Sequence, residues 1–235
     1  MEVKIIELGE LKNPVIDFSG IKNAKLKGTY FGPRMIWKNA SDTRVDGSEA
    51  MIRMKSHTHE EIVGVEGDVS GLVIQNLTLE DGGITFWGLV EHLDILNSTF
   101  FHGHTGIKIS TSKPHQNIKI TGCFIAGMSH EGFYIGPSYQ QLGTALKDVR
   151  ISRNRILACG WDNQVGNCFN AMIWENQFQH NGLKGTWGQK YQLTINPGTQ
   201  AWVWDNCFEG PKYFDMQVLE SDVFAEINYI PFHEA

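Results

Sequence analysis

The stretch Ile151-Ser-Arg-Asn154-Arg-Ile156 decides the fold, because its pattern returns twice further along the chain. The two later copies read Ile173-Trp-Glu-Asn176-Gln-Phe178 and Val203-Trp-Asp-Asn206-Cys-Phe208. Each copy starts with an apolar residue, has an Asn three positions later and ends with a large apolar residue. An internal repeat of this kind indicates a fold built from stacked copies of one structural unit.

Weaker copies of the same pattern extend upstream. Three apolar columns align in seven copies, whose starts lie 48, 21, 25, 31, 22 and 30 residues apart. We interpret the first gap as two units, with a degenerate unit near Ala50–His57. The columns are Leu26, Ile74, Ile95, Ile120, Ile151, Ile173 and Val203; Phe31, Leu79, Phe100, Ile125, Ile156, Phe178 and Phe208; and Ala24, Leu72, Leu93, Ile118, Val149, Ala171 and Ala201.

The copies predict strands rather than helices. Their two leading apolar residues alternate with outward-facing ones, which is strand periodicity, and helical spacing is not sustained. Turn-type residues follow, and Asn and Gly tolerate the left-handed backbone of a sharp bend. These turn residues are Gly28, Asn76, Asn97, Gly122, Asn154, Asn176 and Asn206.

Repeats of about 20 to 30 residues that contain short bent strands predict a solenoid. Leucine-rich repeats are the alternative, but the LxxLxLxxN pattern is absent from the sequence. We therefore expect an all-β chain that forms a right-handed parallel β-helix of about eight coils, as one domain over residues 1–235. Residues 213–235 are expected to form a C-terminal cap or partial further coils. Stacked Asn side chains are expected to hydrogen-bond from coil to coil.

The three quoted copies resemble the parallel β-helix repeat of pectate-lyase-like proteins. The segments His130–Gly136, Gly160–Asp162 and Ile195–Thr199 are similar to parts of secreted bacterial right-handed β-helix proteins. The resemblance covers roughly residues 15 to 210. It implies a secreted or periplasmic location and a carbohydrate ligand. It does not imply one activity, because the superfamily contains lyases, hydrolases, epimerases and non-catalytic adhesins.

Composition and charge limit the classes of partner and the locations expected for this protein. The chain has 235 residues, a formal net charge of -6 and no run of Lys or Arg, which argues against a nucleic-acid partner. No apolar stretch approaches the ~20 residues of a membrane span. The first residues lack the apolar core of a signal peptide, so the sequence predicts either a cytoplasmic protein or one whose signal has been removed. The four cysteines have neither zinc nor disulfide spacing, and we expect free thiols.

Reactive side chains gather in the turn that follows the second strand of each coil. Residues at the same position of successive coils in a solenoid lie side by side. We therefore expect His104 and His130 about one coil apart, with Glu131 and Asp162 within reach. Imidazoles beside carboxylates suit general acid–base catalysis. Turn positions also favour Asp, Asn and His for purely structural reasons, which is the competing interpretation. Candidate substrate-binding residues on this edge are Asp81, His102, Trp161 and His180.

The leading hypothesis is cleavage of an extracellular polysaccharide, with β-elimination ahead of hydrolysis. In elimination, His130 is the candidate base and His104 the candidate acid or neutralising group. Hydrolysis requires two carboxylates about 5–9 Å apart, for which Glu131 and Asp162 are the best pair. The alternative is a non-catalytic glycan-binding, adhesin or phage-spike-type β-helix module, and a third hypothesis is a fragment of a longer enzyme.

Two long connections add candidate sugar-binding residues. Residues 136–147 carry Tyr139, and residues 182–191 carry Lys184 and Trp187. Long connections in compact folds tend to carry function, and rings beside lysines suit an acidic oligosaccharide. Packing of the same rings against the solenoid wall is the equally weighted alternative.

We predict no metal site and no cofactor. The pair His102 and His104 has no third ligand at a diagnostic spacing, and His57–Glu61 fits a solvated loop. Calcium sites of the pectate-lyase type use several carboxylates on one face, and the sequence shows no run of Asp at one phase. A calcium ion is therefore compatible with the resemblance but is not supported by the residues.

The outward positions of the last two copies are aromatic. They carry Trp174, Trp202 and Trp204, with Met172 beside them, where earlier copies carry polar residues. An exposed apolar patch of this size is unusual in a monomer. We expect the tail Tyr213–Phe232 to cover this wall, and sugar stacking or a homo-oligomer contact is the alternative.

Overall fold

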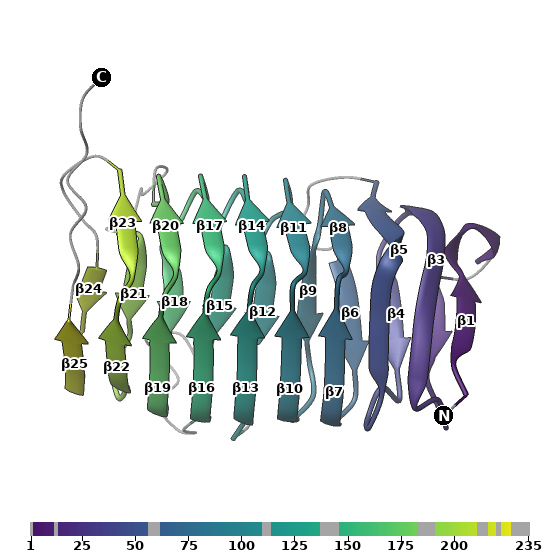
Figure 1. Ribbon diagram of the computed structural model, residues 1–235, viewed down its shortest axis with the longest axis horizontal. Helices are drawn as coiled ribbons and strands as arrows, with labels where there is room; N and C mark the ends of the chain where they lie inside the picture. Colours follow the sequence, from purple (N-terminus) through teal and green to yellow (C-terminus); the bar gives the residue numbers. More distant parts are fainter. Residues whose placement is uncertain are drawn as a thin grey trace.

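The computed structural model describes residues 2–11, 14–55, 62–109, 114–136, 146–182, 191–210, 216–219 and 222–226. Parallel strands stack coil upon coil along one axis, with the N-terminal strands at one end of the rod and the C-terminal strands at the other (Figure 1). The chain is therefore all-β and forms a parallel β-helix, as the repeat predicts. Within these ranges the only helix is the 3-10 turn η1 (Leu8–Glu10), so none is long and apolar enough to cross a membrane.

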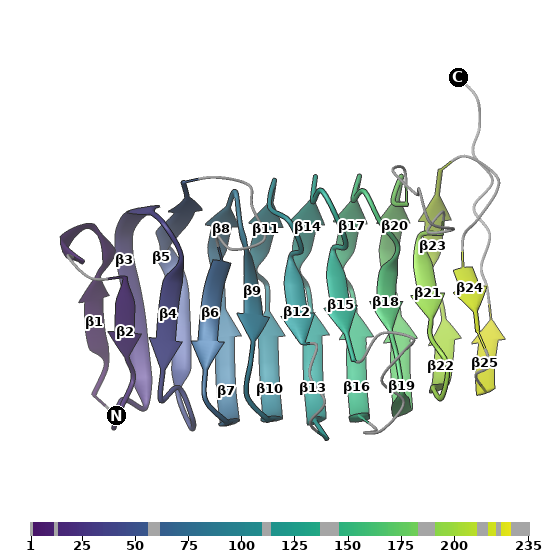
Figure 2. The ribbon, with the colours of Figure 1, turned by 180° about the vertical axis from the view of Figure 1, so that it is seen from behind.

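Three walls of parallel strands enclose the core (Figures 1 and 2). The first and second walls belong to one 16-stranded sheet, because β3 (Asn23–Gly32) and β5 (Arg44–Met54) are long enough to run along both. Strand β1 (Lys4–Glu7) pairs with β3. The third wall is a separate sheet of nine strands.

The strands of each wall follow one another along the axis. The first wall contains β7 (Val69–Gln75), β10 (Val90–Leu96), β13 (Gln116–Thr121), β16 (Leu146–Ser152), β19 (Cys168–Trp174), β22 (Gln200–Trp204) and β25 (Asp222–Glu226). The second contains β8 (Thr78–Glu80), β11 (Thr99–Phe101), β14 (Phe124–Ala126), β17 (Arg155–Leu157), β20 (Gln177–Gln179) and β23 (Cys207–Glu209). The third contains β2 (Val15–Asp17), β4 (Met35–Lys38), β6 (Ile62–Glu66), β9 (Gly83–Phe86), β12 (Ile107–Ile109), β15 (Phe133–Ile135), β18 (Asn163–Val165), β21 (Leu193–Ile195) and β24 (Met216–Val218).

The apolar columns of the repeat form the core. Ile120 pairs with Ile151 and Ile151 with Ile173, and all three are fully buried. In the second wall Ile125 pairs with Ile156, which is equally buried. Each inward residue thus stacks on its counterpart one coil away, about 4.8 Å along the axis. The predicted register is confirmed for these columns.

The alignment of the first copy is wrong by two residues. Ala24, not Leu26, lies in register with Val45 and so starts the column that continues into the later coils. Phe31 is 62 % exposed, and its neighbour Tyr30 takes the inward place. The physical reason is that β3 and β5 each continue as one strand through the position where later coils divide into two strands. A register shift between β3 and β5 near Lys25 and Lys27 then places one extra residue in β5, so the inward residues lose the spacing of the later copies.

A ladder of buried Asn side chains holds the bend between the first and second walls. Asn154 donates from Nδ2 to Oδ1 of Asn176 at 2.9 Å, and Asn176 donates to Oδ1 of Asn206 at 2.9 Å. The backbone N–H of Cys123 donates to Oδ1 of Asn154, which extends the ladder by one coil. The predicted hydrogen bonding between stacked Asn residues is confirmed for these three.

The other turn residues of the repeat form a second column. Asn76, Asn97 and Gly122 have left-handed backbones, with φ of 55°, 47° and 69°. In the later coils this column holds Arg153 and Glu175, while the buried Asn stands one residue further on. The bend thus needs two kinds of residue. One tolerates positive φ, and the other points inward and satisfies the backbone groups that the bend leaves without strand partners.

The aromatic wall lies where the first wall approaches its C-terminal end. The rings of Trp174 and Trp204 stack with centroids 5.2 Å apart, and Trp202 stacks on Phe224 at 5.8 Å. Phe224 belongs to β25, so it extends the row of Trp202 instead of lying over it, and it is 61 % exposed. The described parts of the expected cover, β24 and β25, continue the third and first walls as a further partial coil and do not lie over the tryptophans. The remaining residues of the tail lie outside the described residues, and a cap formed by them stays a prediction.

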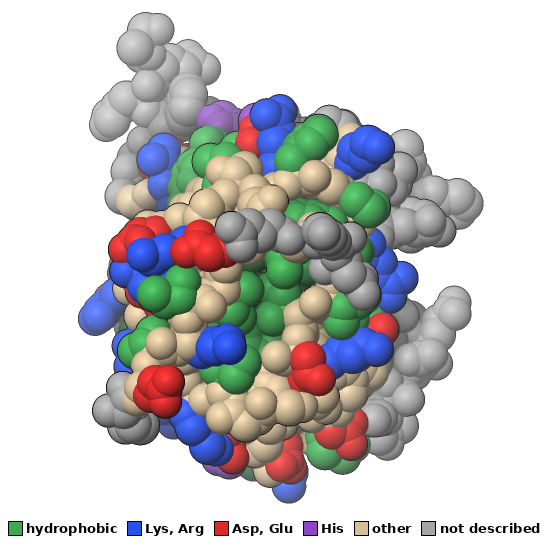
Figure 3. All heavy atoms as spheres, turned by 90° about the vertical axis from the view of Figure 1, so that its right-hand side faces the viewer, with side chains coloured by type: hydrophobic (Ala, Val, Ile, Leu, Met, Phe, Trp, Pro, Cys, Tyr) green, Lys and Arg blue, Asp and Glu red, His purple; other side chains and the backbone are tan. Residues whose placement is uncertain are grey.

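The N-terminal end of the rod exposes part of the apolar interior. Figure 3 looks onto this end and shows hydrophobic side chains near its centre, with charged side chains around them. On the outer side of the first wall, Ile5 of β1 pairs with Lys25 and is 50 % exposed, and the nearby Val3 is 53 % exposed.

All four cysteines are free thiols, and burial raises the pKa of Cys123, Cys159 and Cys168 to about 12.

Candidate functional site

The edge predicted from the sequence separates into two columns of side chains. In the first column Asp81, His102 and His180 directly follow β8, β11 and β20, and all three have left-handed backbones. Gly127 and Ala158 occupy this column in the coils between His102 and His180. His180 therefore lies three coils away from His102, and only Asp81 and His102 are neighbours.

The second column is a continuous stack of rings. The centroids of His104 and His130 are 3.6 Å apart, and those of His130 and Trp161 are 3.7 Å apart. The backbone N–H of His130 donates to the carbonyl of His104, and that of Trp161 to the carbonyl of His130. All three side chains are half-buried. The predicted adjacency of His104 and His130 is thus present, and Trp161 joins them.

Two buried carboxyl groups lie beside this stack. Glu131 is 6 % exposed, and its Oε2 accepts a hydrogen bond from the hydroxyl of Thr105 at 3.0 Å. Asp162 is 1 % exposed and accepts from the backbone N–H of Tyr191 at 2.9 Å and from the hydroxyl of Thr194 at 2.8 Å. Burial raises the pKa of Glu131, and it raises the pKa of Asp162 to about 6. Their depth suits positioning roles better than direct contact with a polymer.

In the stack of His104, His130 and Trp161, which we call the histidine edge, the ring of His130 presents its edge and not a face. Both faces of His130 are covered, one by His104 and the other by Trp161. A sugar stacks on a free aromatic face, so His130 is suited to hydrogen bonding or proton transfer through its ring nitrogens instead. Three other predicted sugar-binding residues, Tyr139, Lys184 and Trp187, lie outside the described residues.

A groove of about 390 Å³ lies elsewhere, on the outer side of the first wall. Its charged lining comes from strands β10, β13 and β16, so it runs across neighbouring coils. Both signs of charge are present. The lining residues are Gly71, Val73, His92, Asp94, Asn117, Ile118, Lys119, Asp148 and Arg150.

The groove follows a row of left-handed residues that crosses the first wall. In five consecutive coils one such residue stands directly before the inward column, and the strands pair in register on both sides of it. A residue of this conformation kinks its strand and redirects the neighbouring side chains, as a bulge does. Repetition of the kink aligns the hollows into one groove. The row is Gly71, His92, Asn117, Asp148 and Asn170, with φ of 70°, 53°, 54°, 54° and 64°.

Two cations meet in this groove. Lys119 of β13 and Arg150 of β16 are direct partners in the strand register, and Asp94 of β10 is the partner of Lys119 on the other side. In the described part of the chain neither cation forms an ion pair. Like charges directly opposite one another on neighbouring strands are destabilising. The pair therefore favours an anionic ligand.

The sequence predicted polar residues at the outward positions of the earlier coils, but not that Asp94, Lys119 and Arg150 among them would line a groove. The usable signal is the residue before each inward Leu72, Leu93, Ile118, Val149 and Ala171. In five consecutive coils it is Gly, His, Asn, Asp and Asn, which are the residue types that best tolerate positive φ.

The stacked walls and aligned core columns define the chain as a parallel β-helix protein. No protein-family model, curated protein or solved structure shows a significant match to this chain.

Proposed function

We propose that this β-helix acts on an acidic extracellular polysaccharide, which lies along the groove of the first wall and is cleaved there by β-elimination. The observation that carries the proposal is the in-register pair Lys119 and Arg150, which lines the groove and has no ion-pair partner among the described residues. A uronic acid or another anionic sugar would pair with these two cations, beside the carboxylates of Asp94 and Asp148 that line the same groove. The resemblance of the repeat to that of pectate-lyase-like proteins supports the same substrate class and a secreted or periplasmic location.

The groove contains candidates for two of the groups that elimination requires, a charge neutraliser and a base. Lys119 and Arg150 neutralise the carboxylate, which makes the adjacent C–H proton more acidic. The imidazole of His92 is exposed in the groove and is the candidate base that takes this proton. The C–H electron pair then forms the new C=C bond while the glycosidic C–O bond breaks. The leaving oxygen takes a proton from a nearby acid or from water.

The histidine edge is a second location for the same chemistry. There His130 is the candidate base, His104 the candidate acid, and Trp161 holds His130 in place by stacking. Among the described residues the stack itself contains no Lys or Arg, whereas two cations line the groove. Variants of His92 and His130 separate the two locations.

Non-catalytic glycan binding is the second candidate function. The observation that favours it is the aromatic wall, where Phe224 continues the row of Trp202 and is largely exposed. A free aromatic face suits the apolar face of a sugar ring. An adhesin or spike module would use such a wall without any turnover.

One experiment distinguishes these functions. The protein is incubated with a panel of acidic and neutral polysaccharides, and unsaturated ends are followed by ultraviolet absorbance while reducing ends are measured chemically. The proposal expects unsaturated ends from acidic polysaccharides only. Reducing ends without unsaturation would mean hydrolysis and contradict elimination, and binding without either product would favour the adhesin-type module.

A further inference from the structure

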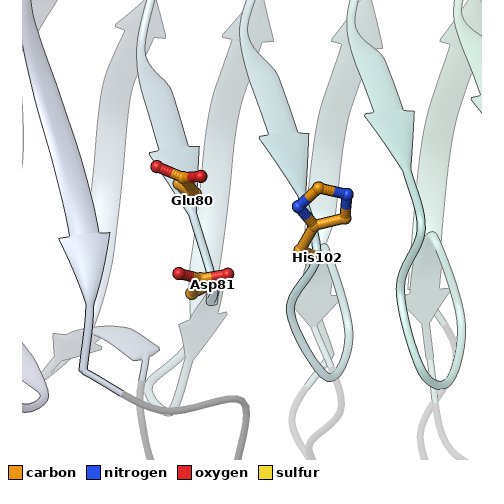
Figure 4. Close-up of side chains that lie close together, drawn as sticks. All are labelled: Glu80, Asp81 and His102. Carbon is orange, nitrogen blue, oxygen red and sulfur yellow. The ribbon is translucent and has the colours of Figure 1, made fainter.

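We infer that Glu80, Asp81 and His102 form a binding site for a first-row transition-metal dication of the Zn²⁺ class, separate from the proposed groove. Each residue offers one ligand atom, and these three atoms lie within 4.8 Å of one another. Figure 4 shows the two carboxylates one above the other, beside the imidazole of the neighbouring coil. Sequence spacing did not reveal the set, because its members come from two coils.

The backbone explains how two consecutive carboxylates reach one ion. Neighbouring residues in a strand point to opposite faces, but β8 ends at Glu80. Asp81 then has φ of 60°, so the chain turns and its side chain lies on the same side as that of Glu80. His102 occupies the equivalent position one coil later, with φ of 62°.

The next coil leaves room for the imidazole. Gly127 follows His102 in the same column, and a Cβ placed there would lie 2.8 Å from Cδ2 of His102. Any larger residue would push the ring out of place. The ring of His102 also makes an edge contact with Phe101, at 5.3 Å between centroids. These contacts hold the imidazole next to the carboxylates.

The ligand atoms indicate the kind of ion. Imidazole nitrogen and carboxylate oxygen are both donors that Zn²⁺ accepts, and three protein ligands leave a fourth position for water, as in open zinc sites. Calcium instead requires six to eight oxygen ligands, and an imidazole is a poor substitute. Metal–ligand bonds of about 2.0–2.2 Å require the three atoms to approach one another slightly. Only side-chain rotation is needed, because His102 is exposed.

A competing cation stands at the same place. Nε of Arg53 lies 3.2 Å from Oδ2 of Asp81 and 3.4 Å from Oε2 of Glu80. The side chain of Arg53 is 50 % exposed, so it can swing away into water. A bound dication would replace this guanidinium. Arg53 is therefore expected to weaken metal binding, which gives the site a signature that a generic surface histidine lacks.

The test is calorimetric titration of the whole chain with ZnCl₂ after removal of metals by a chelator. We expect wild type to bind zinc, with His102→Ala and Asp81→Asn weakening the affinity more than about tenfold, since even the loss of a partner behind a ligand costs that much. Arg53→Gln is expected to tighten binding about fivefold, the factor that corresponds to one exposed ion pair. CaCl₂ is expected not to compete.

The matched control is His180→Ala, which removes a histidine with the same left-handed backbone from the same column. Its zinc affinity should equal that of wild type. Circular dichroism confirms that each variant is folded, and Asp81→Asn preserves the shape of the side chain. The inference is overturned if neither wild type nor Arg53→Gln binds zinc. It is also overturned if His102→Ala binds as tightly as wild type, or if His180→Ala is weakened equally.

Discussion

Lys119 and Arg150 stand side by side on neighbouring strands, in register, on the outer face of the first wall. Strand spacing alone separates their backbones by about 4.8 Å. Asp94 borders Lys119 on the other side, but no ion pair forms with either cation in the described residues. The repulsion between the two cations is relieved when an anion binds. The register of the stacked strands thus places two cations together and favours a negatively charged ligand.

Replacement of Asn176 by Ala should strongly destabilise the fold. The side chain receives hydrogen bonds from the backbone N–H and Nδ2 of Asn154 and donates to the carbonyl of Ile151 and to Asn206. Its removal leaves several buried polar groups without partners, at about 1–3 kcal/mol each. We expect a loss of at least about 3 kcal/mol in the free energy of unfolding, measured by urea denaturation.

The matched control for this ladder is Gln177→Ala, because Gln177 is the next residue and is exposed. A surface change of this kind should alter stability by less than about 0.5 kcal/mol. Equal stabilities for the Asn176→Ala and Gln177→Ala proteins would show that the ladder contributes nothing.

Replacement of Ile151 by Asp should unfold the domain. Ile151 is fully buried between Ile120 and Ile173, so an Asp there would place an unpaired charge in the core. The outward neighbour Arg150 offers a comparison, since Arg150→Asp on the same strand should leave the chain folded. Far-ultraviolet circular dichroism and a melting curve check both variants. A cooperative melt of Ile151→Asp near the wild-type temperature would refute the register.

Stability should fall as the pH rises from about 4 to about 7, and Asp162 should account for part of that fall. Burial raises its pKa from 3.8 to about 6. Between these values the folded chain keeps a proton that the unfolded chain has lost. The contribution is therefore present below about pH 4 and lost as the pH passes about 6. This pKa shift corresponds to a contribution of up to about 3 kcal/mol to the free energy of unfolding.

The variant that isolates this effect is Asp162→Asn. An Asn amide can still accept from Tyr191 and donate to Thr194, but it cannot ionise. Urea unfolding at several pH values should give a flatter profile for the variant than for wild type. Parallel profiles would mean that Asp162 does not titrate as its burial implies. Burial also raises the pKa of Glu131, so this residue should cause part of the pH dependence of stability that remains in the variant.

The two candidate bases are distinguished by their alanine variants. If elimination occurs in the groove, His92→Ala should lower turnover at least about 100-fold, the usual scale for loss of a general base. His130→Ala should then change turnover little, although it removes a stacked ring. The reverse pattern would assign catalysis to the histidine edge. Unsaturated-end formation on an accepted acidic polysaccharide measures both.

The fold followed from the sequence because a parallel β-helix repeats one local pattern. Residues such as Ile120, Ile151 and Ile173 occupy the same position of the repeat in successive coils. That position is buried in each of these coils, so an apolar residue there can be assigned to the core. In the first coils the position in the repeat did not predict which side chains point inward. Strands β3 and β5 continue unbroken where later coils divide into two strands, so equal spacing no longer meant equal orientation, and Phe31 was wrongly placed inside.

The candidate sites were harder to predict than the fold, because they depend on which side chains of different coils lie next to one another. The stack of His104 and His130 followed from their phase, but the separation of His102 and His180 did not. One residue of difference within a turn moves a side chain into another column. The groove depends on the backbone conformation of residues such as His92, whose types permit positive φ without requiring it.

The most direct test of the central claim is the affinity of an acidic polysaccharide for a protein that carries both Lys119→Gln and Arg150→Gln. The control is Lys147→Gln, which removes an exposed cation from β16 outside the groove lining. The account predicts that the double variant loses at least about tenfold in affinity at low salt, whereas Lys147→Gln and wild type bind equally. Equal weakening by the control, or undiminished binding by the double variant, would contradict it.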